Sequence, residues 1–515
     1  MTGSIRSCRE DLRRLFNTQP EAPALIDAQS DTKLSYGDLD AITARAAAAL
    51  LDRGASPERP VVAVLPNGID TLVLFLGALR AGIDFAPLTP QTSTRDLDSW
   101  LDLVKPGLCI YSVSSSDIVE ASSEDVQRLS IVPNASFGWL DSDRGGSEPA
   151  AAGRSSRLLL HTSGTTGEPK VLAFDCDTLW SSGRAFAQHH DFLGPECRFF
   201  NILPMSYLGG LYNLGLLPLG VGSSVAVGES FSGKSFISFW QDLERLDVNV
   251  LWLVPTIMRG LLTLSKRTRS RGVDLVKNEI RACFVGTAPI DLATKQEFER
   301  EFGIPVLENF ALSETTFITS ETLGSRYRRE EHSVGDVLPY VDVRLSPAHS
   351  EESGEGFNEL QVRTPYLFLG YLLRDGNIEL PETEDGWFPT GDLGNLSEGK
   401  TFLYRGRTRD IIKRAGYLIV LREVEVLAEQ HALVEEASAV PISHDFYGED
   451  YVLAVRIRPD AAAEVEDPLS DIRIWVNGNL AKYKWPGKIV EREDFPRTAS
   501  GKVRKNVFAR ELAER

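Results

Sequence analysis

The sequence predicts an α/β protein built from at least two domains. Short apolar runs typical of buried strands, such as PVVAVLP (60–66), alternate with longer segments of helical periodicity, such as GIDTLVLFLGALRAG (68–82). This alternation indicates parallel sheets that are covered by helices on both faces. The chain has 515 residues, whereas single hydrophobic cores stop growing at about 250 to 300 residues. We therefore expect more than one domain.

The N-terminal part gives two clear helix signals. Ser35 and Asp38 have the spacing of a capping box, and apolar residues follow them at helical intervals. The helix at 68–82 is expected to end at Gly82, because glycine readily takes the left-handed conformation that closes a helix. The alternation then continues with strands predicted at 248–255, 280–286 and 304–310 and a helix predicted at 291–303.

One uncharged stretch, residues 205–228, raises the question of a membrane span. A spanning helix needs about 20 predominantly apolar residues. Glycine recurs through this stretch, however, and Pro218 divides it. We therefore expect a buried helix, a turn and a strand here, and no membrane span.

The C-terminal part has a different pattern. Short half-buried strands with turn signals between them are predicted at 359–364 and 401–407. Beyond residue 408 the chain becomes a compact piece with its own helix and strand signals. We therefore place a large domain at 1–408 and a small α+β domain at 409–515.

Composition and charge limit the function. The formal net charge of -18 argues against a nucleic-acid partner, because phosphate backbones are bound through clustered Lys and Arg. The five cysteines form no CxxC pair, so neither a zinc site nor a disulfide framework is indicated. The N-terminal residues lack the apolar core of a signal peptide. We expect a protein of the reducing cytoplasm.

The segment HTSGTTGEPK (161–170) is the first candidate for chemistry. It follows the apolar run Leu158 to Leu160 and combines hydroxyl side chains, glycines and Lys170. Backbone and hydroxyl donors with a mobile positive charge suit a phosphate group. A flexible surface connection is the simpler alternative. The segment matches neither GxxxxGK[ST] nor GxGxxG, so it belongs to neither of the common nucleotide loops.

This segment resembles the phosphate loop of the adenylate-forming superfamily, which contains acyl- and aryl-CoA synthetases, adenylation domains of nonribosomal peptide synthetases, and luciferases. Further family motifs are matched in the family's order along nearly the whole chain. They are LSYGDL (34–39), LRAGIDFAPLTP (79–90), NFALSETT (309–316), WFPTGDLG (387–394), YRGRTRDIIKRAGYLIVLREVE (404–425) and FPRTASGKVRK (495–505). The resemblance implies a large domain of parallel sheets with a small barrel-like β part, and a small mobile C-terminal lid.

The resemblance also implies residues for the first reaction, the transfer of an adenylyl group from ATP. Glu314 would be the ligand of Mg²⁺, with Ser313 beside it. Asp392 and Arg407 would bind the ribose, and Lys502 would balance charge at the α-phosphate. The residues that would cradle the β- and γ-phosphates are Thr162, Ser163, Gly164, Thr165, Thr166, Gly167 and Lys170.

A second reaction is implied for the same pocket. Arg409 stands at the family's hinge position, where Asp or Lys is commoner. Rotation of the small domain there would withdraw Lys502 and present the loop of Gly416 to a thiol acceptor. A glycine at this point lets a pantetheine arm approach the backbone.

The expected acid pocket departs from the family pattern. Tyr207 replaces the His of many acyl-CoA synthetases and cannot titrate near neutral pH. Leu208 replaces the Asp that pairs with an amino-acid ammonium group, which argues against an α-amino acid substrate. Val171 and Ala311 both replace glycine and add bulk. The full set of predicted pocket residues is Tyr207, Leu208, Gly209, Gly286, Ala311 and Phe317.

The leading hypothesis is an ATP-dependent carboxylic acid ligase that forms an acyl- or aryl-adenylate and then a thioester, with coenzyme A as the expected acceptor. The alternative is a free-standing adenylation enzyme of secondary metabolism that passes the acyl group to the phosphopantetheine of an acyl carrier protein, or to an amine. A nucleotide-binding scaffold without catalysis and a luciferase-like oxidation also stay open. The sequence does not choose between an aryl and an aliphatic acid.

Overall fold

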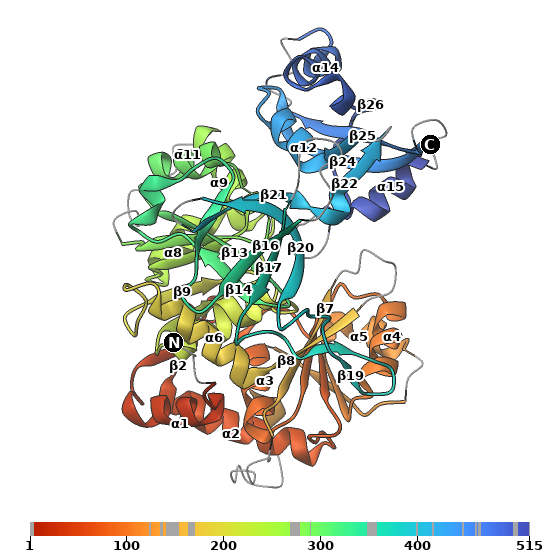
Figure 1. Ribbon diagram of the computed structural model, residues 1–515. Coiled ribbons are helices and arrows are strands. Elements are labelled where there is room, and N and C mark those ends of the chain that lie inside the picture. Colours follow the sequence, from red (N-terminus) through yellow and green to blue (C-terminus); the bar gives the residue numbers. More distant parts are fainter. Residues whose placement is uncertain are drawn as a thin grey trace. The chain divides into compact units, whose positions relative to one another are not determined.

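The chain forms two compact units, seen here in a computed structural model (Figure 1). Unit 1 consists of Met1–Tyr327, Leu338–Val341 and Thr364–Pro381, and unit 2 of Arg328–Val337, Asp342–Arg363 and Glu382–Arg515. The domain boundary predicted after residue 408 lies inside unit 2 and stays a prediction. The structure describes residues 5–122, 125–133, 137–140, 154–162, 170–267, 279–288, 290–347, 358–397, 400–414, 417–444, 448–458, 461, 465–497 and 503–513.

Unit 1 contains two large sheets. The first has the order β2-β1-β10-β9-β11-β12-β13-β14. Its central strands run parallel, while β2 and β14 pair antiparallel with β1 and β13. The strands are β1 (Pro23–Asp27), β2 (Lys33–Ser35), β9 (Arg198–Asn201), β10 (Ser224–Val227), β11 (Val250–Leu253), β12 (Ala282–Val285), β13 (Val306–Leu312) and β14 (Thr316–Ser320).

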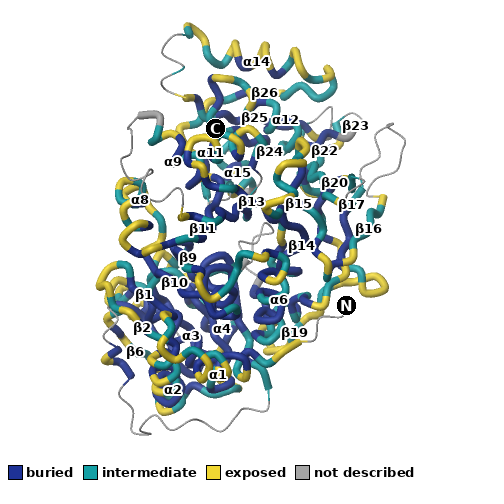
Figure 2. The backbone as a smooth tube through the Cα atoms, turned by 90° about the vertical axis from the view of Figure 1, so that its left-hand side faces the viewer, coloured by how far each residue is buried: buried dark blue, intermediate teal, exposed yellow. Residues whose placement is uncertain are grey.

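The second sheet of unit 1 has the order β19-β18-β8-β7-β4-β3-β5-β6. Strands β7, β4, β3, β5 and β6 are parallel neighbours, whereas β7, β8, β18 and β19 are joined antiparallel. The strands are β3 (Val61–Val64), β4 (Phe85–Leu88), β5 (Leu108–Ser112), β6 (Arg128–Ile131), β7 (Arg157–Thr162), β8 (Lys170–Asp175), β18 (Gly370–Leu372) and β19 (Ile378–Glu379). The predicted parallel sheets are thus confirmed, and β3, β4, β11 and β12 are buried along their whole length. Figure 2 colours the backbone by burial, with buried segments such as β11 in dark blue.

The two helix signals of the N-terminal part are confirmed in the structure. The capping box is present at the start of α2, where Ser35 and Asp38 bond each other's backbone N–H groups. Helix α3 ends before Gly82, whose φ is 74°. The helices are α1 (Cys8–Thr18), α2 (Tyr36–Asp52), α3 (Ile69–Ala81), α4 (Thr94–Val104), α5 (Ser116–Glu120), α6 (Cys176–Gln188), α8 (Ser235–Arg245), α9 (Pro255–Arg267) and α11 (Leu292–Phe302).

The uncharged stretch 205–228 folds as predicted, with one difference. The buried helix is a π-helix, η3 (Gly209–Leu216), which continues into the short α7 (Leu217–Gly220) before strand β10. A π-helix bonds residues five apart and is frequent at functional sites. Among the described residues, no helix has the length and apolar character needed to cross a membrane.

The described residues of unit 2 form two groups of paired strands and the helices α12, α14 and α15. The first sheet is antiparallel, with the order β16-β17-β20-β21-β15, and corresponds to the small β part that was predicted. The second has the order β23-β22-β25-β24, with β26 parallel to β25. The elements are β15 (Ser333–Val337), β16 (Asp342–Pro347), β17 (Asn358–Arg363), β20 (Phe388–Leu396), β21 (Thr401–Arg407), β22 (Ile411–Arg414), β23 (Tyr417–Val420), α12 (Leu421–Glu429), β24 (Val434–His444), β25 (Gly448–Ile457), α14 (Pro468–Asn479), β26 (Lys488–Glu491) and α15 (Lys505–Ala513).

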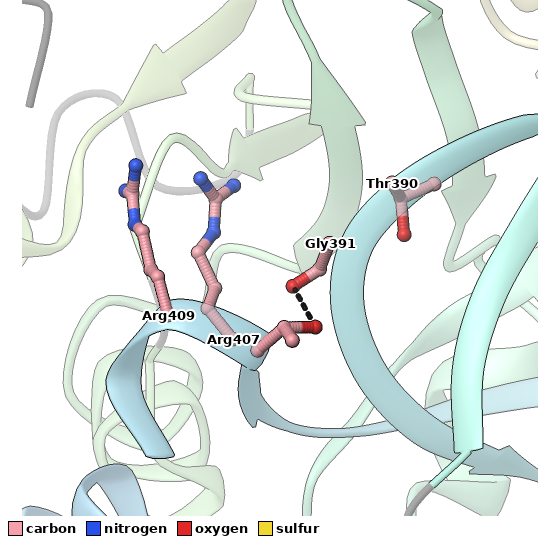
Figure 3. A pocket seen from close by; sticks show the side chains of 5 residues that line it. Thr390, Gly391, Arg407 and Arg409 are labelled. Carbon is pink, nitrogen blue, oxygen red and sulfur yellow. Dashed lines mark hydrogen bonds between the residues drawn. The ribbon is translucent and has the colours of Figure 1, made fainter. Parts of the chain in front are cut away.

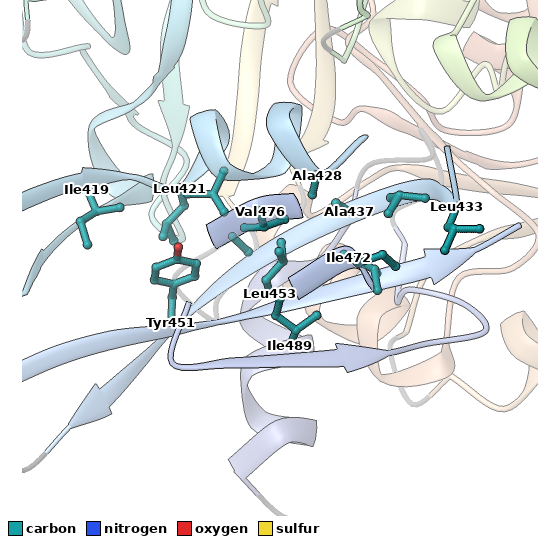
Figure 4. Packing of buried hydrophobic residues seen from close by; sticks show 14 of the residues in the cluster. Ile419, Leu421, Ala428, Leu433, Ala437, Tyr451, Leu453, Ile472, Val476 and Ile489 are labelled. Carbon is teal, nitrogen blue, oxygen red and sulfur yellow. The ribbon is translucent and has the colours of Figure 1, made fainter. Parts of the chain in front are cut away.

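The second sheet of unit 2 has a hydrophobic core of its own. Figure 4 shows α12 and α14 contributing side chains to a cluster with this sheet. Each part of this α+β layer supplies buried aliphatic residues, which is the arrangement expected of an independent core. The cluster includes Ile419, Leu421, Tyr451, Leu453, Ile472, Val476 and Ile489.

Candidate functional site

Ser313 and Glu314 lie in the tight turn that joins β13 to β14. The turn is closed by a hydrogen bond from the Thr315 N–H to the Leu312 carbonyl at 3.3 Å. Thr316 follows with a φ of 57°, a left-handed conformation that is uncommon for a β-branched residue. Such backbone conformations persist only where the surrounding structure holds them, and they cluster at functional sites. The half-buried Glu314 is therefore carried by a firmly held turn.

A chain of hydroxyl groups holds Thr316 in place. Its Oγ1 is hydrogen bonded with Ser182 Oγ at 2.7 Å, and Ser182 accepts a hydrogen bond from the Tyr212 phenol at 2.9 Å. All three side chains are buried. Helix α6, helix η3 and the turn after Glu314 are thereby linked.

The segment Thr364–Pro381 packs against Glu314. The Phe368 N–H donates to the Glu314 carbonyl at 2.8 Å, and the phenol of Tyr371 in β18 lies near enough to feel the negative charge of Glu314. Burial, with the negative charge of Glu314, raises the pKa of Tyr371 to about 12. The phenol is therefore protonated at neutral pH. Sequence reasoning missed Tyr371, because nothing in the local pattern LFLGYLL links it to a residue far away in the chain.

A buried cluster of charged side chains holds the β13–β14 hairpin together. Lys295 Nζ lies 2.6 Å from Glu308 Oε2 and 2.9 Å from Glu321 Oε1, and Glu321 also accepts from the Glu308 N–H at 2.9 Å. Burial opposes the charge on Lys295, but the two carboxylates more than compensate and raise its pKa. Removal of one member of such a cluster leaves an uncompensated buried charge. The cluster thus fastens β13 to the end of β14.

Two predicted pocket residues, Ala311 and Phe317, face each other across this hairpin. The Phe317 ring lies 4.0 Å from Phe186, 5.5 Å from Trp252 and 5.7 Å from Tyr212, measured between ring centroids. Aromatic side chains therefore pack closely around Phe317 and fill the space beside it.

Tyr207, Leu208 and Gly209 lie at the start of η3. A Cβ added to Gly209 would be 2.5 Å from the Tyr207 ring, and one added to Gly210 would be 2.3 Å from the Pro204 carbonyl oxygen. Gly210 is therefore required, because the contact is with backbone, whereas a Cβ at Gly209 would have to displace the Tyr207 ring. The Tyr207 phenol oxygen is buried and has no hydrogen-bond partner among the described residues. Burial raises the pKa of Tyr207, so this side chain stays neutral near neutral pH.

Gly286 lies directly after β12, where a side chain would not fit. A Cβ on Gly286 would be 2.8 Å from Asn309 Oδ1 and 2.9 Å from the Asn309 carbonyl oxygen. Thr287 follows with a φ of 72°. The loop after β12 is thereby held against β13, the strand that leads to Glu314.

The predicted phosphate loop connects β7 to β8. Thr162 ends β7 and Lys170 begins β8, and these two residues are paired across the antiparallel ladder. The pairing brings the two ends of the predicted loop side by side. The predicted loop residues Ser163, Gly164, Thr165, Thr166 and Gly167 lie outside the described residues, as do the side chains of Thr162 and Lys170.

Asp392 and Arg407, the predicted ribose-binding pair, are brought together in unit 2. They are partners across strands β20 and β21, and Arg407 Nε donates to Asp392 Oδ1 at 2.9 Å. The Asp392 side chain is 0% exposed, whereas that of Arg407 is 30% exposed. Beside them is an open pocket of about 330 Å³ lined by Thr390, Gly391, Arg407, Thr408 and Arg409 (Figure 3). Figure 3 shows the two arginine side chains extending side by side, while Thr408 donates to the Gly391 carbonyl at 3.3 Å.

Arg409, the predicted hinge residue, is exposed in a short helical turn (Thr408–Asp410). Its neighbour Asp410 lies 3.7 Å from Lys505 Nζ, which is also 2.8 Å from Glu425 Oε1. No local signal in the sequence indicated this link between the predicted hinge and α15. Gly416 and Lys502, the predicted tunnel and catalytic residues, lie outside the described residues.

The part of the chain that the structure describes contains no group of three or more His, Cys, Asp or Glu side chains that could hold a metal ion. A metal site at Glu314 would therefore draw on at most two such side chains among the described residues. This suits Mg²⁺ in nucleotide-binding sites, where one or two carboxylates share the ion with phosphates and water.

Comparison with known proteins gives two adjacent family matches. Residues 12–372 match the model of the family described as AMP-binding enzyme. Residues 423–502 match the model described as AMP-binding enzyme C-terminal domain. The first match alone spans more than half of the chain.

Curated relatives and solved structures agree with these matches. The chain is 28% identical over 502 residues to a sulfoacetate–CoA ligase from Cupriavidus necator, covering 94% of each chain. It is 26% identical over 498 residues to an oxalate–CoA ligase from Arabidopsis thaliana, again covering 94% of each. The crystal structure of ATP-bound MatB from Rhodopseudomonas palustris superposes with a TM-score of 0.84 at 25% identity, covering 98% of this chain and 99% of that one.

Proposed function

Because the chain belongs to the AMP-binding enzyme family, we propose that it is an AMP-forming, ATP-dependent ligase that joins a carboxylic acid to a thiol. In the first step the acid reacts with ATP to give an acyl-adenylate and pyrophosphate. In the second step the thiol displaces AMP. The observation that carries this proposal is the match of both family parts, in order, to a chain whose Asp392 and Arg407 pair beside an open pocket.

In the first step, a carboxylate oxygen of the acid attacks the α-phosphorus of ATP, and the bond between that phosphorus and the bridging oxygen to the β-phosphate breaks. Negative charge develops on the departing pyrophosphate. The hydroxyls, amides and lysine between Thr162 and Lys170 suit this charge. Lys502 is proposed to balance charge at the α-phosphate and the attacking carboxylate.

The surroundings of Glu314 suit a magnesium ion bound together with ATP. The carboxylate is a hard oxygen ligand, the turn is firmly held, and the Ser313 hydroxyl is next to it in the chain. When bound there, the ion would supply positive charge that neutralises the phosphates. The backbone hydrogen bonds of this turn would then keep the Glu314 and Ser313 oxygens in a fixed orientation.

Asp392 is proposed to accept hydrogen bonds from the ribose hydroxyls. A carboxylate has about four lone-pair sites, so it can accept from a diol as well as from Arg407. Because Asp392 is completely buried, it must be paired to remain ionised. The partly exposed Arg407 provides that pairing and is proposed to contact the same sugar.

In the second step, the thiol sulfur attacks the carbonyl carbon of the adenylate, the carbon–oxygen bond to AMP breaks, and the thiol proton is lost to water. We place the hinge for this step at Arg409 and the approach of the thiol at Gly416. Covalent activation explains the order of events, since AMP is a better leaving group than the oxygen of the free acid.

We propose that the acid is short. The aromatic packing around Phe317 leaves little room beside the predicted pocket, with Phe186 at a centroid distance of 4.0 Å. The two ligases compared above are named for sulfoacetate and oxalate, which are short acids with a second acidic group. Tyr207 would contribute a neutral hydroxyl to such a pocket, because its pKa is raised by burial.

Coenzyme A is the proposed thiol, because the curated relatives compared above are named CoA ligases. The test incubates the purified protein with Mg²⁺, ATP and separate pools of short diacids, medium aliphatic acids and aryl acids. Pyrophosphate release is measured with and without coenzyme A, and thioesters are sought by mass spectrometry. Release with a CoA thioester supports the ligase, and release without one moves the acceptor to a carrier protein or an amine. ATP binding without release for any pool supports the inactive scaffold.

A further inference from the structure

We propose that Ser182 is a positioning residue for the magnesium–nucleotide complex, acting through the turn that carries Glu314. This inference rests on the proposed function, because it takes Glu314 as the carboxylate that holds the ion. Its own observation is a chain of two hydrogen bonds between buried hydroxyl groups. Ser182 Oγ lies 2.7 Å from Thr316 Oγ1 and accepts a hydrogen bond from the Tyr212 phenol at 2.9 Å.

Each member of this hydroxyl chain comes from a segment that is close in sequence to predicted ligand residues. Thr316 lies two residues after Glu314, the proposed metal ligand. Tyr212 belongs to η3, the helix that begins at the predicted acid pocket. Ser182 belongs to α6, which directly follows β8, the strand that starts at Lys170 of the predicted phosphate loop. Ser182 therefore joins three segments that are predicted to bind the metal, the acid and the phosphates.

The hydroxyl chain lies in an apolar part of the structure. Its three members are at most 3% exposed. The ring of Phe317, which follows Thr316, packs against Phe186 of α6 and against Tyr212. Hydrogen bonds are electrostatically stronger in such surroundings, and a buried hydroxyl that loses its partner is costly. Loss of the Ser182 hydroxyl would thus deprive both Tyr212 and Thr316 of the partner that they share.

The helices that carry the chain are packed closely together. A Cβ on Gly183, the residue after Ser182, would lie 3.3 Å from the Cα of Leu217, where η3 continues into α7. A side chain at this position would push the two helices apart. The backbone of Ser182 is therefore held at a fixed distance from the segment that contains η3.

The turn of Glu314 depends on contacts of this kind. Its own closing bond, from the Thr315 N–H to the Leu312 carbonyl, is 3.3 Å long, which is longer than the usual 2.9 to about 3.0 Å. Thr316 also has a φ of 57°, a conformation that persists only where the surrounding structure holds it. Without the bond to Ser182 we expect Thr316 to relax, and the Glu314 carboxylate to lose its fixed orientation.

The test compares Ser182→Ala with Ser181→Ala in the full chain. Both serines are buried on α6, and Ser181 also has one hydrogen bond, which it accepts from the Arg6 N–H at 2.8 Å. ATP affinity is measured by calorimetry with Mg²⁺ and with EDTA, without any acid. We expect Ser182→Ala to weaken ATP binding about 3- to 10-fold with Mg²⁺, as for the loss of one hydrogen bond. Binding in EDTA should not change, and Ser181→Ala should change neither.

A pair of substitutions at Thr316 tests the role of the hydroxyl without altering Ser182. Thr316→Val removes the hydroxyl and keeps the shape of the side chain, whereas Thr316→Ser keeps the hydroxyl. We expect Thr316→Val to show the same Mg²⁺-dependent loss as Ser182→Ala, and Thr316→Ser to bind Mg²⁺–ATP like wild type. Urea denaturation establishes that each variant is folded, and the Thr316 pair decides the question if Ser182→Ala does not fold.

Tyr212→Phe tests whether the acid-pocket helix takes part. It removes only the phenol hydroxyl, so its effect on Mg²⁺–ATP affinity should be smaller than that of Ser182→Ala and should add nothing to it in the double variant. Additive losses, an equal loss in EDTA, or wild-type Mg²⁺-dependent affinity in both Ser182→Ala and Thr316→Val would overturn the inference. Absence of any Mg²⁺-dependent ATP binding by the wild-type protein would instead contradict the proposed function.

Discussion

Two carboxylates proposed to hold ATP, Asp392 in unit 2 and Glu314 in unit 1, are supported in opposite ways. Asp392 is completely buried and lies in a strand, with an arginine 2.9 Å from its Oδ1. Glu314 is half-buried and lies in a turn near the neutral phenol of Tyr371. The first carboxylate is paired with a protein cation, whereas the second has a neutral phenol as its neighbour.

The difference matches the chemistry proposed for each group. A sugar diol is neutral, so the carboxylate that binds it must be stabilised in advance by a protein charge. A magnesium ion brings its own charge, and a cationic neighbour at Glu314 would repel it. The pairing of each carboxylate therefore predicts its ligand.

Neither of these carboxylates is proposed to stabilise charge at the α-phosphate. That role is proposed for Lys502. We expect Lys502→Ala to reduce adenylate formation about 100- to 1000-fold, because a charge-stabilising donor is lost. Conversion of added acyl-adenylate and thiol should continue. Pyrophosphate release and thioester formation are measured separately, with Lys488→Ala as the exposed control. Equal loss of both steps would contradict this role.

Asp392→Asn should affect nucleotide binding regardless of the metal. We expect ATP affinity to fall about 10- to 100-fold both with Mg²⁺ and in EDTA, since hydrogen bonds to a charged acceptor are lost. The free energy of unfolding should also fall by about 1 kcal/mol, because Arg407 loses an ionised partner. Calorimetry and urea denaturation measure the two effects, with Glu382→Gln as the exposed control. An effect limited to Mg²⁺–ATP would remove the distinction between the two carboxylates.

Glu314→Gln should affect only the metal-dependent part of binding. We expect ATP affinity to fall about 10-fold or more with Mg²⁺, through loss of one charged ligand, with no change in EDTA. The free energy of unfolding should stay within about 0.5 kcal/mol of wild type, as at other partly exposed sites. Glu301→Gln on α11 is the matched control. A loss in EDTA as large as that with Mg²⁺ would contradict the assignment.

The smallest expected effect concerns the phenol at Glu314 and appears only at alkaline pH. In the folded chain the pKa of Tyr371 is raised to about 12 from an ordinary value of 10.0. The unfolded chain therefore loses this proton first, so the contribution to stability is complete below pH 10 and disappears as pH rises through about 12. We expect the free energy of unfolding to fall less steeply over this range in Tyr371→Phe than in wild type, as measured in urea at several pH values. Equal slopes would contradict the raised pKa.

The sequence predicts the fold well where local signals are strong. The capping box at Ser35 and the helix end at Gly82 are properties of neighbouring residues, and both are found as predicted. Apolar runs also identify the central strands of both sheets. The direction of a strand cannot be predicted in this way, because hydrophobic periodicity carries no information about strand direction. The antiparallel pairs β7–β8 and β13–β14, which bound the predicted phosphate loop and carry Glu314, could not be predicted from the pattern.

The residues of the candidate site also fall into two groups: those that sequence motifs identify and those that only the fold brings together. Motifs identify Glu314, Asp392 and Arg407, and the pairing of the last two across β20 and β21 agrees with a shared role. Tyr371 and the Asp410–Lys505 contact could not be foreseen, because each joins residues that are distant in sequence and that only the fold brings together. Residue types alone contain no information about such pairings.

The π-helix η3 also limits which insertions and deletions the chain can accept. Its hydrogen bonds span one residue more than those of an α-helix. Deletion of a single residue within Gly209–Leu216 would permit ordinary helical bonding and would rotate one end of the helix relative to the other by about 100°. Tyr212 and Tyr207 would then no longer both keep their present neighbours, Ser182 and Gly209. The length of this segment, and not only its composition, therefore determines where these side chains lie.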